Sequence, residues 1–145
     1  MDKPKICILG LGYIGLPTAA FLANKNFEVN GVDINKSIVD QVNKGTVHIV
    51  EPKLDEYVEN AVKKNKLSAS LTPIKSDIFI IAVPTPLINK KPDISFVQSA
   101  IKMIIPVLEK GNLIIIESTC PLGSTKLMAE IIFNESNIKE SELFM

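Results

Sequence analysis

The 145-residue sequence contains no arginine and no tryptophan, a single histidine, two cysteines and no excess of charge. Two cysteines are too few for the disulfide framework of a small secreted domain. Sixteen basic residues balance sixteen acidic ones, which argues against a nucleic acid or a membrane as partner. No apolar run approaches the length that spans a bilayer. Because residues 1–5 lead directly into an apolar run, we expect no signal peptide and a cytoplasmic location.

The few soft ligands in the sequence do not form a metal-binding pattern. His48 is followed by Glu51, but no cysteine or second acid stands at metal-ligand spacing, so we expect no metal. Cys7 lies inside an apolar run and is expected to pack in the core. Cys120 precedes a predicted helix, whose dipole would lower the pKa of its thiol and favour a nucleophile.

The strongest signal in the sequence is a glycine-rich turn directly after its first apolar run, residues 6–9. Gly10, Gly12 and Gly15 follow in G-x-G-x-x-G spacing, and a helical pattern begins there. In a dinucleotide site, the first glycine permits a tight turn and the second lets the backbone approach a pyrophosphate. The third lets the helix pack closely, and the N–H groups at the start of that helix face the phosphates. Asp33 ends the next strand-like run, as this motif requires for the ribose hydroxyls.

The rest of the chain alternates between strand and helix patterns. Residues 78–83 and 113–116 carry no polar side chain, which is typical of central parallel strands covered on both faces. We expect strands at 6–9, 28–33, 67–71, 78–83 and 113–116, and a further strand opening at 141–145. Helices are expected to begin near Gly15, Lys36, Pro52, Ser95 and Ser124. Asp93 or Ser95 could cap the fourth of these helices, and Ser95 with Gln98 fits a capping box.

This alternation predicts one doubly wound parallel α/β sheet, a Rossmann domain over residues 1–145. Ligands of such sheets bind at the carboxyl ends of the strands, near the point where the strand order reverses. The segments around Gly10, Thr85 and Thr119 follow three predicted strands and should therefore converge on one crevice.

Six short motifs also carry a resemblance to a known family. They read GLGYIGLP, GVDIN, HIVEP, AVPTP, PD and ESTCPLGST, and they lie between residue 6 and about residue 128. In these the sequence resembles the N-terminal NAD-binding domain of the UDP-glucose/GDP-mannose dehydrogenase family of nucleotide-sugar 6-dehydrogenases. The resemblance implies oxidation of the C6 alcohol of a UDP-sugar to a carboxylate, with two NAD reduced in succession.

The same resemblance implies that the catalytic cysteine, the lysine and the UDP-binding domain lie beyond Met145. We therefore expect a fragment that is truncated near its sixth strand and is inactive alone. The family has no catalytic cysteine at the position of Cys120, which removes the reason to assign it a covalent role. The complete enzyme is implied to be a homodimer, and a monomer is left open for this chain.

The resemblance assigns residues on the cofactor side only. Asp33 is implied to bind the adenosine ribose, and Thr119 is implied to be catalytic by holding the nicotinamide or orienting a water. Without the resemblance, Thr85 and Thr119 would be read as ordinary loop residues. The implied NAD-binding residues are Gly10, Gly12, Tyr13, Ile14, Gly15, Asp33, Val83, Pro84, Thr85, Ser118 and Thr119. NAD is expected rather than NADP, because Asp33 would repel a 2′-phosphate and no arginine stands beside it.

Two hypotheses of different classes stay open. The first is the NAD-binding domain of a UDP-sugar dehydrogenase, and the second is a stand-alone nucleotide-binding regulatory module. A reading frame that continues past Met145 would favour the first. Within the family, the HIVEP motif favours the branch that oxidises N-acetylmannosamine, while UDP-glucose, GDP-mannose and UDP-N-acetylglucosamine remain alternatives.

Overall fold

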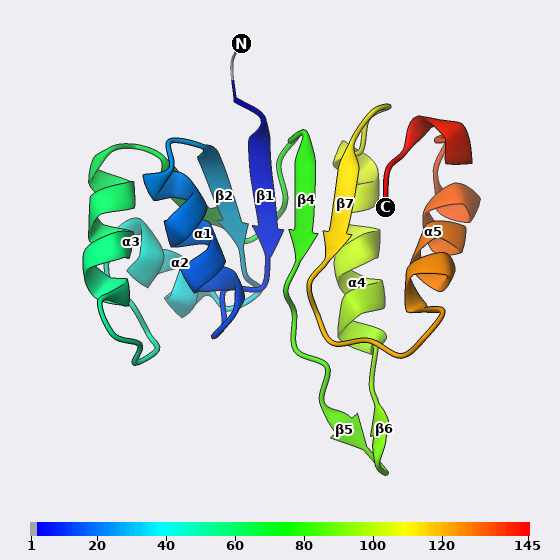
Figure 1. Cartoon of the computed structure of the whole chain (residues 1–145), viewed down its shortest axis with the longest axis horizontal. Coiled ribbons are helices and arrows are strands. Elements are labelled where there is room, and N and C mark those ends of the chain that lie inside the picture. Colours follow the sequence, from blue (N-terminus) through cyan, green and yellow to red (C-terminus); the bar gives the residue numbers. More distant parts are fainter. Residues whose placement is uncertain (1–2) are drawn as a thin grey trace.

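A five-stranded parallel sheet forms the centre of the computed structural model, which describes residues 3–145 (Figure 1). The strand order is β3-β2-β1-β4-β7, and all four pairings within this sheet are parallel. The chain runs outward from β1 in one direction and then starts again at β4 in the other. The predicted doubly wound sheet is therefore confirmed. The strands are β1 (Lys5–Leu9), β2 (Glu28–Val32), β3 (Leu67–Ser70), β4 (Ile78–Ile81) and β7 (Leu113–Ile116).

Helices cover both faces of this sheet, and successive side chains of β1 point into two separate cores. Ile6 and Ile8 pack with the helices of one face, whereas Cys7 and Leu9 pack with those of the other. None of the helices in the described residues is long and apolar enough to span a membrane. The first face carries α1 (Gly15–Asn24), α2 (Lys36–Asn43) and α3 (Leu54–Lys63), and the second carries α4 (Ser95–Ile104) and α5 (Ser124–Glu135).

One predicted helix start and one predicted capping box differ from the structure. The helix expected from Pro52 begins at Leu54, because Lys53 takes a left-handed backbone conformation with φ 63°. The capping box expected of Ser95 and Gln98 does not form. Instead the carboxylate of Asp93 accepts a hydrogen bond from the Ser95 N–H at 2.9 Å. An acidic side chain thus satisfies a free amide at the start of α4.

The segment after β4 departs most from the prediction. The strand expected to reach residue 83 ends at Ile81, and the chain then enters a short antiparallel hairpin, β5 (Leu87–Ile88) and β6 (Lys91–Pro92). This hairpin projects beyond the carboxyl ends of the sheet (Figure 1). Of the strand expected at 141–145, the structure forms a single parallel bridge between Leu113 and Phe144.

The outer edge of β3 is occupied by a side chain from α2. The Asn43 Nδ2 donates to the Ala69 carbonyl at 2.9 Å, and the Asn43 Oδ1 accepts from the Ala69 N–H at 2.8 Å. These two bonds replace those that a neighbouring strand would make. At the other edge, the Ile114 N–H of β7 donates to the Phe144 carbonyl at 2.8 Å.

Candidate cofactor site

A crevice lies at the carboxyl ends of β1, β4 and β7, where the strand order reverses. Residues 12–14, 82–85 and 117–119 line it, and its volume is about 550 Å³. The three segments around Gly10, Thr85 and Thr119 therefore meet at one crevice, as predicted from the sequence. The predicted site residues that line the crevice are Gly12, Tyr13, Ile14, Val83, Pro84, Thr85, Ser118 and Thr119, whereas Gly10, Gly15 and Asp33 lie behind or beside it. Ala82 and Glu117 also line it and were not predicted.

The three glycines of the turn have different structural surroundings. Gly10 has φ 93°, and a Cβ added there would lie 2.7 Å from the Ala82 carbonyl oxygen. A Cβ on Gly15 would lie 1.8 Å from the Gly10 carbonyl oxygen. A Cβ on Gly12 would meet nothing within 4 Å in the described chain. The fold therefore requires Gly10 and Gly15, whereas the space beside Gly12 is open to a ligand.

The start of α1 presents unbonded amide groups to this space. Within the described residues, no acceptor is found for the N–H groups of residues 12–15, and the first bond of the helix runs from the Leu16 N–H to the Gly12 carbonyl at 3.1 Å. The first turn of α1 also carries no acidic residue. Free amides at the positive end of a helix bind anionic groups, and the adjacent phosphates of a pyrophosphate fit this arrangement.

Asp33 stands at the end of β2, on the side of the glycine turn. One carboxylate oxygen accepts from the Leu11 N–H at 3.0 Å, and the other accepts from the Asn35 N–H at 2.9 Å. Asp33 thus ties the glycine turn to β2, a role that the sequence analysis missed. The nearby Lys36 pairs with Asp40 along α2 at 2.6 Å, so its ammonium group is engaged away from Asp33.

Neither cysteine is placed as a nucleophile. Cys7 is fully buried, and its burial raises the pKa of the thiol to about 12. Partial burial also raises the pKa of Cys120, and a hydrogen bond with Ser124 opposes this only in part. The lowering expected from the following helix was therefore wrong in direction. Across residues 3–145 no group of three or more His, Cys, Asp or Glu side chains is arranged to hold a metal.

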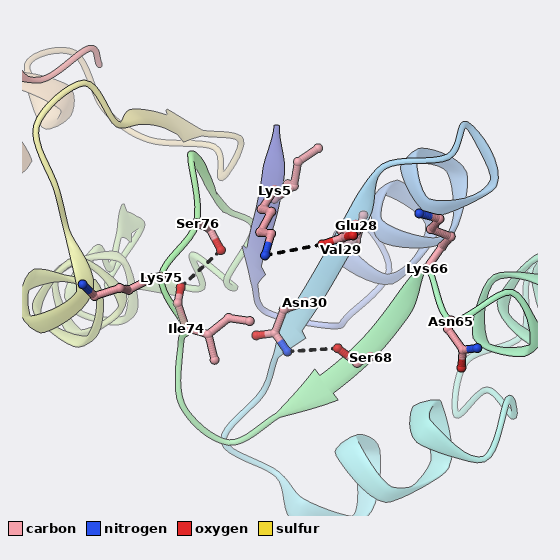
Figure 2. Close-up of a pocket in the computed structure, with 11 residues that line it drawn as sticks. Lys5, Glu28, Val29, Asn30, Asn65, Lys66, Ser68, Ile74, Lys75 and Ser76 are labelled. Carbon is pink, nitrogen blue, oxygen red and sulfur yellow. Dashed lines mark hydrogen bonds and ion pairs between the residues drawn. The ribbon is translucent and has the colours of Figure 1, made fainter. Parts of the chain in front are cut away.

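A smaller cavity of about 180 Å³ lies at the opposite, amino ends of the strands (Figure 2). Lys5 and Glu28 pair across it at 3.6 Å, and the Asn30 Nδ2 donates to the Ser68 Oγ at 3.4 Å. Four of the polar side chains that line this cavity are thus paired with each other. It is separated from the glycine turn by the length of β1, and it contributes nothing to the crevice.

These features define a dinucleotide-binding domain. They are the doubly wound sheet, the glycine turn with free amides, the acidic residue that ends β2, and the crevice where the strand order reverses. The family model "UDP-glucose/GDP-mannose dehydrogenase family, NAD binding domain" matches residues 4–144. The chain therefore belongs to the UDP-glucose/GDP-mannose dehydrogenase family, as its NAD-binding domain.

Individual relatives agree with this assignment. The chain is 53% identical over 131 residues to the UDP-N-acetyl-D-mannosamine dehydrogenase of Escherichia coli K12, which covers 90% of this chain and 31% of that protein. It is 51% identical over 133 residues to the Campylobacter jejuni enzyme of the same name, covering 90% and 33%. The structure of the UDP-N-acetyl-mannosamine dehydrogenase Cap5O from Staphylococcus aureus superposes with a TM-score of 0.91 at 39% identity, over 96% of this chain and 34% of that one. The chain thus spans about a third of the length of these relatives.

Proposed function

We propose that the chain forms the cofactor half of an NAD-dependent UDP-sugar 6-dehydrogenase that converts UDP-N-acetyl-D-mannosamine to the uronic acid with two NAD. The free amide groups of residues 12–15, at the edge of a crevice that residues 12–14 line, are the observation that carries this proposal. The choice of sugar is supported by the names of the relatives at 51% and 53% identity. UDP-glucose, GDP-mannose and UDP-N-acetylglucosamine are the competing substrates.

In this proposal, each part of the dinucleotide is bound by its own set of residues. The amides of residues 12–15 hold the pyrophosphate. Asp33 accepts bonds from the adenosine ribose, since each of its oxygens has a lone pair beyond the one used by the backbone. From the reversal point, the nicotinamide half then extends towards Thr85, Ser118 and Thr119. When bound, NAD accepts a hydride from the sugar.

Thr119 is the residue we assign to catalysis. It is exposed in the wall of the crevice, directly after Ser118, and its hydroxyl has no hydrogen-bond partner among the described residues. The hydroxyl can therefore hold the nicotinamide or orient a water beside the reacting carbon. Positioning of this kind supplies several kcal/mol of a typical barrier reduction.

A domain exchange tests the proposal. Residues 1–145 replace the matching segment of the Escherichia coli relative, and NADH formation is followed with UDP-N-acetyl-D-mannosamine. We expect turnover, and we expect its loss in the same chimera carrying Gly12→Val. A folded chimera that binds the UDP-sugar and forms no NADH would instead support a stand-alone regulatory module.

The sugar is tested in the complete protein that contains this chain, by comparing kcat/KM for the four nucleotide sugars. If kcat/KM is higher for one of the other three nucleotide sugars, that sugar is the substrate in place of UDP-N-acetyl-D-mannosamine. We also propose that the complete protein is cytoplasmic, acts in polysaccharide biosynthesis and forms a homodimer. Sedimentation would measure its oligomeric state.

A further inference from the structure

The loops that follow β4 and β7 separate soon after their strands end. The two strands stay in register up to the pair Ile81 and Ile116. The N–H groups of Glu117 and Ser118 then both donate to the Ile81 carbonyl, at 2.9 and 3.1 Å. Beyond that point, a single hydrogen bond in residues 3–145 joins segment 82–86 to segment 117–123. It runs from the Ser118 Oγ to the Val83 carbonyl at 2.7 Å.

The loop after β4 has few other means of being held. Pro84 and Pro86 have no N–H group to donate. The Ala82 N–H already donates to the Leu9 carbonyl of β1 at 2.8 Å. The Ser118 hydroxyl has one proton and two carbonyl oxygens in reach, those of Val83 at 2.7 Å and Ile81 at 3.2 Å. The shorter contact takes the proton, so the hydroxyl links the two loops.

Resting on the function proposed above, we infer that Ser118 is a positioning residue that holds the two loops of the nicotinamide half at a fixed separation. Thr85 lies two residues after Val83, and Thr119 directly follows Ser118. Neither threonine hydroxyl has a hydrogen-bond partner within the described residues, so both are free for a ligand. The division of roles follows from this: Ser118 sets the spacing, and the two threonines contact the cofactor.

This role predicts a selective loss of affinity. ADP occupies the glycine turn and the Asp33 side only, whereas NAD also needs the loops after β4 and β7. Loss of the link leaves the binding of ADP intact and weakens that of NAD. The loss of this one partly buried hydrogen bond corresponds to a weakening of roughly fivefold to tenfold.

The experiment compares the chain with its Ser118→Ala and Ser118→Thr variants, and with Ser76→Ala as the matched control. Ser76 also donates its hydroxyl to a backbone carbonyl, that of Ile74 at 3.2 Å, but at the amino end of β4. Calorimetric titration gives the Kd of each variant for NAD and for ADP. Amide hydrogen exchange of residues 117 and 118 reports the link without any ligand.

For Ser118→Ala we expect about fivefold to tenfold weaker NAD binding, ADP binding within about twofold, and faster exchange at residues 117 and 118. Ser118→Thr keeps a hydroxyl and should restore NAD binding, and Ser76→Ala should leave both ligands unchanged. Unchanged NAD binding in Ser118→Ala, or equal weakening of NAD and ADP, overturns the inference alone. If the unmodified chain binds neither ligand, the proposed function fails, and the inference fails with it.

Discussion

Replacing Gly12 with valine should abolish NAD binding and leave the fold intact. A Cβ at this position meets no atom of the described chain within 4 Å, and Gly12 is not among the residues with positive φ. We therefore expect the free energy of unfolding to change by no more than about 0.5 kcal/mol, which shifts Tm by roughly 2 °C or less.

The effect on the ligand is far larger, because the valine side chain would fill the space that the pyrophosphate needs. Keeping the phosphates away from two amides removes two hydrogen bonds to a charged group. At about 1.5 kcal/mol or more each, their loss weakens NAD by more than about a hundredfold. Thermal unfolding and calorimetric titration on the same sample measure both quantities.

Gly15→Ala is the matched control, since its Cβ would lie 1.8 Å from the Gly10 carbonyl oxygen. It should destabilise the fold by about 3 kcal/mol, the size of a severe packing conflict. The two glycines thus separate a ligand effect from a folding effect. A folded Gly12→Val chain that bound NAD as tightly as the unmodified chain would refute the assignment of the phosphate site.

Three further predictions concern the cofactor, the thiols and the activity. The chain should prefer NAD to NADP, and Asp33→Ala should weaken NAD by about 1–3 kcal/mol through lost bonds to the ribose; tighter binding of NADP in titrations would contradict this. Because burial raises the pKa of both thiols, to about 12 for Cys7, alkylation followed by mass spectrometry should leave Cys7 unlabelled at pH 8. Labelling of Cys120 should be slower than that of a free thiol at neutral pH and rise with pH; rapid labelling of Cys120 at neutral pH would restore it as a nucleophile. The isolated chain, mixed with NAD and UDP-N-acetyl-D-mannosamine, should form no NADH above the blank; turnover that disappeared in Cys120→Ser would show that this chain carries a catalytic thiol.

The sheet and its helices were predictable because they depend on local patterns of polarity. Fully apolar runs marked β4 and β7, and alanines at helical spacing marked the face of α1. The hairpin of β5 and β6 left no such pattern. Its strands have two residues each, and its turn uses Asn89 and Lys90 with φ 51° and 62° in place of a glycine.

In the candidate site, too, some features were predictable from local sequence patterns and others were not. Glycine spacing and strand ends were enough to predict which segments meet, since the topology of a parallel sheet fixes that. The bond from Ser118 to Val83 joins residues 35 positions apart, and that from Leu11 to Asp33 joins residues 22 apart. Such contacts depend on the register of neighbouring strands and on where each strand ends, and no local sequence pattern encodes either.

The pairing of Asn43 with Ala69 bears on how the protein behaves at high concentration. An unpaired strand edge is a template on which a second chain can add, and this is how native proteins begin to aggregate. In β3, only four residues long, the central outward-facing amide and carbonyl are already used by one side chain. At the opposite edge, the Ile114 N–H of β7 is bonded to the Phe144 carbonyl, so the backbone groups of both outer strands are partly occupied. Asn43, which is not among the residues that line the crevice, thus limits the addition of a further strand beside β3.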